Sequence, residues 1–319
     1  MTVIKFNIII ILCLVYAGVL FPVEHSQPIR GVTFEYSAPP GANYDKAEFR
    51  LWYANNTGPL HGTIILLTGS NGDGRPMVED SVWQTFAVQH TLALVGCYFT
   101  DKPHEQGFIE EYADVSQGSG QALLDALTSF AKQSGHVELA TAPLLLWGMS
   151  AGGEFNYEFV AWQPERVIAF VVNKGGIYYS ALLSKAARNV PGMLFIGGKD
   201  IEFRNDTIKG LFAINRRAGA LWALAQEPEA GHEISRSLEM SLIFFAEVLP
   251  LRLSANAGSS EALPLRAIDQ KSGYLGDLKT GMITEIGDNE IPNHPTTWLP
   301  TERIAKAWQA LVTDQPFPK

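Results

Sequence analysis

Cysteine is almost absent from this chain of 319 residues, which contains only Cys13 and Cys97. Cys13 lies in an N-terminal apolar segment that we expect to be removed, so no intrachain disulfide can form. The fold must therefore be stabilised by packing. Cys97 lies in the apolar run 92–99 and is expected to be a buried core residue.

Clusters of basic residues are also missing. The chain has 24 Lys and Arg against 33 Asp and Glu, a formal net charge of −9, which argues against a nucleic-acid partner. The metal-binding spacings H-x-H, H-E-x-x-H and C-x-x-C do not occur. The phosphate-binding pattern G-x-x-x-x-G-K-[ST] fails because Arg75 follows Gly74 where a Lys is needed. We expect neither a metal nor a cofactor.

An apolar run marks the N-terminus. Lys5 precedes residues 6–21, which are apolar apart from Asn7. This run is short for a membrane span and has the length of the apolar core of a secretory signal. We predict a signal peptide over 1–25, a secreted or periplasmic protein, and no other membrane segment. An uncleaved membrane anchor is the alternative.

The hydrophobic pattern of the remaining chain alternates between strands and helices. Segments 31–36 and 47–53 alternate apolar and polar residues and predict an antiparallel edge pair. The strands expected after them are 63–67, 92–99, 144–147, 167–172, 193–196 and 221–225, and the expected helices are 79–89, 119–132, 151–162, 207–218 and 234–249. Such an order predicts an α/β fold with a mostly parallel central sheet flanked by helices.

The chain is expected to divide into a main domain and a small addition. We assign the main domain to 28–252. Residues 253–319 begin with linker-like composition and are too short to hold a core of their own. We predict that they form a linker and a C-terminal appendage packed on the main domain, with a hairpin over 274–286 and a helix over 300–312.

The most informative segment is 143–153, which reads Pro-Leu-Leu-Leu-Trp-Gly-Met-Ser-Ala-Gly-Gly. A short apolar strand stops at a G-x-S-x-G centred on Ser150, and a helix follows. Strand, tight turn with serine at its apex, and helix is the context of a nucleophile elbow. Gly148 and Gly152 would allow close approach of the neighbouring backbone, and the turn would strain the serine. The alternative is a glycine-rich turn whose serine only caps the helix.

The order of elements around this turn resembles the α/β-hydrolase fold over about residues 30–250. In that family the catalytic triad follows the chain order serine, acid, histidine. The resemblance implies that Ser150 is the nucleophile. It also implies that Asp200, after the strand 193–196, is the acid. His232, in the loop after the strand 221–225, would be the base. The alternative for His232 is a solvent-facing loop histidine.

Two other acidic residues compete with Asp200. Glu202 and Asp206 follow the same strand. We interpret Asp206 as the N-cap of a helix that begins at Thr207. Asp200 could itself be only a turn aspartate beside two glycines.

The resemblance further implies an oxyanion hole after the strand 63–67. The family often has His-Gly where this chain has Thr68-Gly69. Backbone N–H groups stabilise the oxyanion in this family, so the change of side chain at Thr68 need not abolish the oxyanion hole. We assign the donors as the N–H groups of Ser70 and Ala151.

The motifs Gly-Met-Ser-Ala-Gly-Gly, Gly-Lys-Asp and Gly-His are similar to those of secreted esterases of the polyhydroxybutyrate depolymerase and feruloyl or acetyl-xylan esterase group. This implies a serine hydrolase that cleaves a small-molecule or polymer-linked carboxylic ester through an acyl-enzyme on Ser150. Alternatives are a peptidase or a dienelactone-hydrolase-like enzyme of the same fold, although the latter typically has a cysteine nucleophile. A non-catalytic binding module is disfavoured because all three triad positions are present. The natural acyl group and the oligomeric state stay open.

Tryptophans occur beside the serine turn and in the appendage. They could stack on sugars or phenolic acids, but tryptophan is more often a core residue. The residues concerned are Trp147, Trp162, Trp298 and Trp308.

Overall fold

The computed structural model describes residues 29–107, 109–254, 264–287 and 296–318. The predicted signal peptide and residues 255–263 of the predicted linker lie outside the described residues. Among those described, no helix is both long enough and apolar enough to cross a lipid bilayer.

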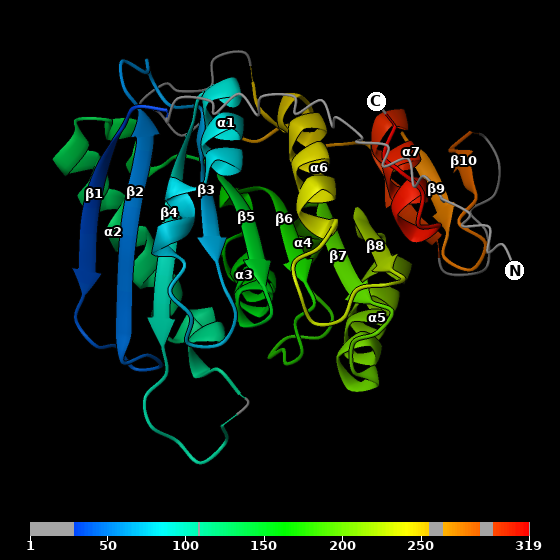
Figure 1. Ribbon diagram of the computed structural model, residues 1–319, viewed down its shortest axis with the longest axis horizontal. Coiled ribbons are helices and arrows are strands. Elements are labelled where there is room, and N and C mark those ends of the chain that lie inside the picture. Colours follow the sequence, from blue (N-terminus) through cyan, green and yellow to red (C-terminus); the bar gives the residue numbers. More distant parts are fainter. Residues whose placement is uncertain (1–28, 108, 255–263, 288–295, 319) are drawn as a thin grey trace, which may run out of the picture.

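An eight-stranded sheet with the strand order β1-β2-β4-β3-β5-β6-β7-β8 forms the centre of the molecule (Figure 1). Its first two strands are antiparallel to each other, and β2 is antiparallel to β4, whereas the other neighbours are parallel. The predicted antiparallel edge and parallel centre are confirmed. The strands are β1 (Gly31–Ala38), β2 (Lys46–Ala54), β3 (Gly62–Leu67), β4 (Leu92–Thr100), β5 (Leu144–Met149), β6 (Val167–Asn173), β7 (Gly192–Gly197) and β8 (Trp222–Glu227).

Helices cover both faces of the sheet and enclose two hydrophobic clusters. One cluster takes its helical residues from α2, α3, α4 and α5, and the other from α1, α6 and α7. The faces of β3, β5, β6 and β7 are buried on both sides, which explains their continuous apolar runs. The helices are α1 (Ser81–His90), α2 (Ser119–Ser134), α3 (Ala151–Trp162), α4 (Lys185–Arg188), α5 (Glu202–Arg217), α6 (Ser237–Arg252) and α7 (Glu302–Val312), and the short 3₁₀ turns are η1 (Arg75–Glu79), η2 (Glu111–Ala113), η3 (Val115–Gln117), η4 (Val137–Ala140) and η5 (Pro164–Arg166).

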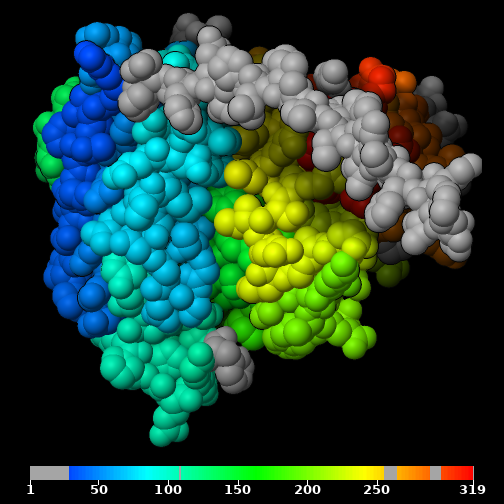
Figure 2. All heavy atoms as spheres, in the orientation of Figure 1, coloured from blue at the N-terminus to red at the C-terminus, as the bar shows by residue number. Residues whose placement is uncertain are grey.

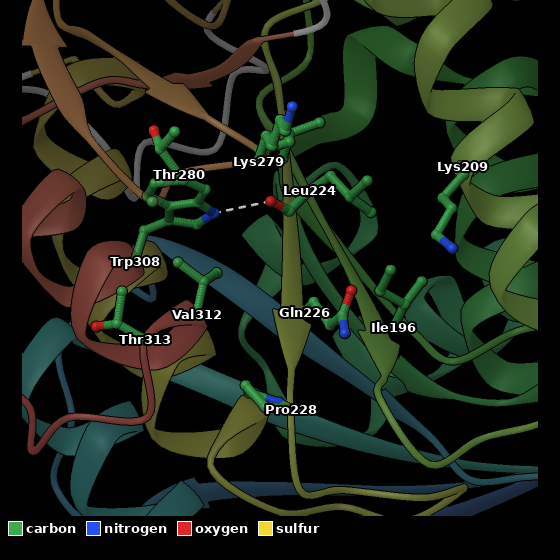
Figure 3. A pocket seen from close by; sticks show the side chains of 12 residues that line it. Ile196, Lys209, Leu224, Gln226, Pro228, Lys279, Thr280, Trp308, Val312 and Thr313 are labelled. Atoms are coloured by element: carbon green, nitrogen blue, oxygen red, sulfur yellow. Dashed lines mark hydrogen bonds between the residues drawn. The ribbon is translucent and has the colours of Figure 1, made fainter.

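The described part of the appendage packs against the edge strand β8. It contains α7 and a three-stranded antiparallel sheet of β9 (Tyr274–Asp277), β10 (Ile283–Glu285) and β11 (Thr296–Leu299). The Leu224 N–H donates to Thr297 Oγ1 at 2.7 Å, and Trp308 Nε1 donates to the Leu224 carbonyl at 2.7 Å. Figure 3 shows this indole beside a cavity of about 390 Å³ between β8 and the appendage. These contacts satisfy polar groups that an edge strand would otherwise expose.

Three element predictions need correction. The helix α5 begins at Glu202, not Thr207. Its first turn has no buried side chain, and its one apolar residue, Phe203, is exposed, so the buried face that predicts a helix starts only at Ile208. Asp206 therefore lies inside the helix and is not its N-cap. The strand β11 was not predicted, and α6 begins at Ser237, later than expected. The four tryptophans considered for stacking on a substrate belong to the core: Trp147, Trp298 and Trp308 are buried, and Trp162 packs against the core.

Candidate active site

Ser150 stands at the turn between β5 and α3 in a strained backbone conformation. Its φ is 53° and its ψ is −123°, a backbone region that residues other than glycine rarely adopt. The Ser150 N–H donates to the Asn173 carbonyl at 2.8 Å, and the Gly152 N–H donates to the Thr68 carbonyl at 3.0 Å. The turn is thus held between the carboxyl ends of β6 and β3.

The glycines of the motif are required by close approach. A Cβ on Gly148 would lie 2.1 Å from the Gly152 carbonyl oxygen, and one on Gly152 would lie 2.6 Å from the Thr68 carbonyl oxygen. Neither position can accept a side chain without moving the backbone. The strained serine and the close packing of the glycines agree with the elbow predicted from the sequence.

The structure brings Ser150, Asp200 and His232 together, although they lie on three different loops. His232 Nε2 is 3.0 Å from Ser150 Oγ, and His232 Nδ1 is 3.0 Å from Asp200 Oδ2. An ionised carboxylate can only accept, so the proton of the neutral imidazole belongs on Nδ1. Nε2 is then free to accept the serine proton.

Asp200 is held in place by more than the histidine. Its side chain is 1% exposed and receives hydrogen bonds from Arg204 Nε at 3.1 and 3.2 Å and from the Ile201 N–H at 2.7 Å. Burial alone would raise the pKa of Asp200. The hydrogen bonds from Arg204, His232 and the backbone outweigh burial and bring the pKa below its ordinary value. The carboxylate therefore stays ionised beside the imidazole.

The competing acids lie away from the histidine. Glu202 and Asp206 are exposed on α5, and Asp206 Oδ1 is 3.5 Å from Lys209 Nζ. Within the described parts of the chain, the carboxylate that contacts the His232 ring is that of Asp200.

The loop after β3 lies against the serine turn, as the oxyanion prediction requires. A Cβ on Gly69 would be 3.5 Å from the Ser150 Cβ. A tight turn closes the loop, since the Gly72 N–H donates to the Gly69 carbonyl at 2.9 Å. Within the described residues, the N–H groups of Ser70 and Ala151 donate no hydrogen bond, so both are available to a ligand. Their role as oxyanion donors stays a prediction.

The surface near the site is hollowed. Figure 2 shows a depression between the blue-to-cyan part of the molecule and the yellow residues that include the start of α6, with green atoms at its floor. Beside the loop after β3 lies a cavity of about 250 Å³. Its lining is mostly polar and comprises Ser70, Asn71, Asp101, Lys102, Pro103, His104, Gly107, Ile109 and Glu110.

Sequence reasoning missed a buried carboxyl behind the nucleophile. Glu154, in the first turn of α3, is 3% exposed. Its Oε1 accepts the N–H groups of Gly176 at 2.5 Å and Ile177 at 3.0 Å, whereas its Oε2 has no hydrogen-bond partner among the described residues. Burial raises the pKa of Glu154 to about 7 despite the two N–H groups. The sequence signal was weak: Glu154 is one of three polar residues, with Asn156 and Glu158, in a largely apolar helix.

We expect Glu154→Gln to remove a pH dependence of stability. The ordinary pKa is 4.5, so between about pH 4.5 and 7 the folded protein holds a proton that the unfolded chain has lost. The free energy of unfolding of the wild type should therefore fall by about 3 kcal/mol across this window, relative to the variant, and level off above it. Urea denaturation of both proteins at several pH values measures this.

The exposed Glu165→Gln is the matched control and should keep the wild-type profile. If the free energy of unfolding of Glu154→Gln depends on pH in the same way as that of the wild type, Glu154 does not hold a proton in the folded state at neutral pH.

No family model matches the chain, and no curated protein matches its sequence. The chain has the α/β-hydrolase fold. This follows from the strand order and the serine turn after β5.

Solved structures with a similar arrangement include a poly(3-hydroxybutyrate) depolymerase from Bordetella parapertussis, with 16% identity, a TM-score of 0.47, and coverage of 71% of this chain and 92% of that one. The esterase PE8 has 17% identity, a TM-score of 0.47, and coverage of 69% and 99%. A poly(aspartic acid) hydrolase from Sphingomonas has 14% identity, a TM-score of 0.45, and coverage of 69% and 98%. At these values the likeness assigns no activity to this chain.

Proposed function

We propose that the protein is a serine hydrolase that cleaves carboxylic esters. The observation that carries this is the continuous chain of contacts from Ser150 Oγ through the His232 ring to the Asp200 carboxylate, at 3.0 Å for each step. Nothing in the packing of the core requires these three polar groups to meet. Their meeting is what activation of a serine hydroxyl needs.

The reaction follows from the geometry. His232 Nε2 takes the proton of Ser150 as Oγ attacks the ester carbonyl, and the buried Asp200 carboxylate stabilises the imidazolium that forms. The free N–H groups of Ser70 and Ala151 would receive the negative charge that develops on the carbonyl oxygen. His232 then returns the proton to the leaving alcohol. Water, deprotonated by the same ring, releases the acid from Ser150.

The substrate is proposed to be a small-molecule or polymer-linked ester. The polar cavity beside Ser70 favours a substrate group with hydroxyl or charged substituents over a long alkyl chain. A panel of acetyl, feruloyl and hydroxybutyrate esters against long-chain acyl esters would sort the class. Secretion is proposed from the apolar segment 6–21 alone, and N-terminal sequencing of the expressed protein tests it.

The test of the reaction class is labelling of the full chain with a fluorophosphonate, followed by peptide mapping. We expect a single labelled peptide that carries Ser150, and no label after heat denaturation. Absence of label would favour a binding module, and label on another serine would place the nucleophile elsewhere.

A further inference from the structure

A fully buried lysine lies under the loop that carries His232. Lys174 follows β6, has a left-handed φ of 57°, and has no exposed surface. Its ammonium group donates to Asn173 Oδ1 at 3.1 Å, to the Glu233 carbonyl at 2.9 Å, and to the Glu227 carboxylate. An ammonium group has three protons, so all of them are used.

Glu227 and its neighbours complete the network. The second carboxylate oxygen, Oε1, accepts the Ser237 N–H at 2.8 Å, and Asn173 Nδ2 donates to Ser237 Oγ at 3.0 Å. Glu227 ends β8 and Ser237 begins α6. The network therefore holds both ends of the loop 228–236, and through Glu233 it holds the residue directly after His232.

The same network reaches the nucleophile. Asn173, whose side-chain oxygen binds Lys174, accepts the backbone N–H of Ser150 through its carbonyl. The serine turn and the histidine loop thus share one buried support at the carboxyl end of β6.

Stability alone does not account for this ion pair. Removing two charges from water costs several kcal/mol per ion, and apolar residues of similar volume often replace a buried pair without loss. The Asp200 carboxylate holds one nitrogen of the His232 ring, at 3.0 Å. The side chain is still 31% exposed, so the distance from Nε2 to Ser150 Oγ also depends on where the loop backbone places the residue.

We propose that Lys174 and Glu227 form a clamp that positions His232 against Ser150 and acts on the reaction only through that histidine, because Ser150 is hydrogen-bonded to the backbone carbonyl of Asn173 and not to the ion pair. This rests on the proposed function. Both residues are positioning residues: the hydrogen bonds of their side chains among the described residues go to Asn173, Glu233, Ser237 and each other, and not to Ser150 Oγ or the His232 ring. Displacement of a reacting group by about 1 Å can cost about 100-fold in rate.

The test measures the rate at which a reactive fluorophosphonate labels Ser150. We expect Glu227→Gln to slow labelling by about 100-fold. Glu229→Gln is the matched control, because Glu229 lies in the same loop but its ion pair with Lys199 is exposed, at 69% and 61% of the side chains. It should label at the wild-type rate.

A second background separates positioning from a general structural effect. In His232→Ala, Glu227→Gln should cause no further slowing, because the residue through which the clamp acts is gone. Equal slowing in both backgrounds would mean a general structural role and would overturn the proposal, as would no slowing in the wild-type background. A wild type that is not labelled at all would instead contradict the proposed function.

Folding of each variant is checked by thermal unfolding. If Glu227→Gln does not fold, the double variant Lys174→Met/Glu227→Met carries the test, since it leaves no unpaired buried charge. It should fold and still label about 100-fold more slowly than the wild type. Wild-type labelling by this folded double variant would overturn the clamp.

Discussion

Ser150→Ala should lower the turnover of a simple p-nitrophenyl ester by up to about six decades in kcat. The variant removes the hydroxyl that His232 Nε2 contacts and leaves the loop after β3 intact. The hydroxyl has His232 Nε2 as its hydrogen-bond partner. Alanine also has a Cβ, so adopting φ 53° strains it about as much as it strains serine. The free energy of unfolding should therefore change little. Steady-state kinetics and urea denaturation measure the two quantities.

The exposed Ser37→Ala, on the edge strand β1, is the control and should keep full activity. Turnover retained by Ser150→Ala would mean that the serine turn is only a structural turn. A large loss of stability in that variant would mean that the hydroxyl holds the elbow together, and the kinetic effect could then not be assigned to chemistry.

The serine turn could be predicted from the sequence because much of what shapes it is local. Gly148 is required by a contact within the turn, where a Cβ would lie 2.1 Å from the Gly152 carbonyl oxygen, whereas a Cβ on Gly152 would lie 2.6 Å from the Thr68 carbonyl oxygen after β3. The strand before the turn is buried on both faces, so its apolar run is unbroken. The parallel order of the sheet follows from the same kind of signal in β3, β6 and β7.

The supports of the site could not be predicted because they depend on packing between distant segments. Lys174 and Glu227 lie 53 positions apart, and nothing in either local sequence marks them as a buried pair. Arg204 contacts Asp200 because α5 begins earlier than its apolar pattern indicates. A charged residue normally signals a solvated surface, so its burial becomes visible only when the partner is in place.

Asp200→Asn should lower kcat by about four decades, whereas Asp206→Asn should leave it nearly unchanged. The amide of asparagine can donate to His232 Nδ1, which would favour the tautomer with the proton on Nε2. That ring could not accept the proton of Ser150, although all distances would be kept. Arg204 would also lose the charge that it faces at 3.1 Å. Steady-state kinetics on the same ester compares the two variants.

Asp206 is a strict control because it is the same residue type, six positions away and exposed on α5. Its contact with Lys209, at 3.5 Å, joins two exposed side chains and contributes little. A large loss in Asp206→Asn with normal turnover in Asp200→Asn would reassign the acid. The pH profile adds an independent check. Hydrogen bonds from Arg204 and His232 bring the pKa of Asp200 below its ordinary value against the effect of burial, so acidification to that ordinary value should not yet protonate Asp200 or remove activity through it.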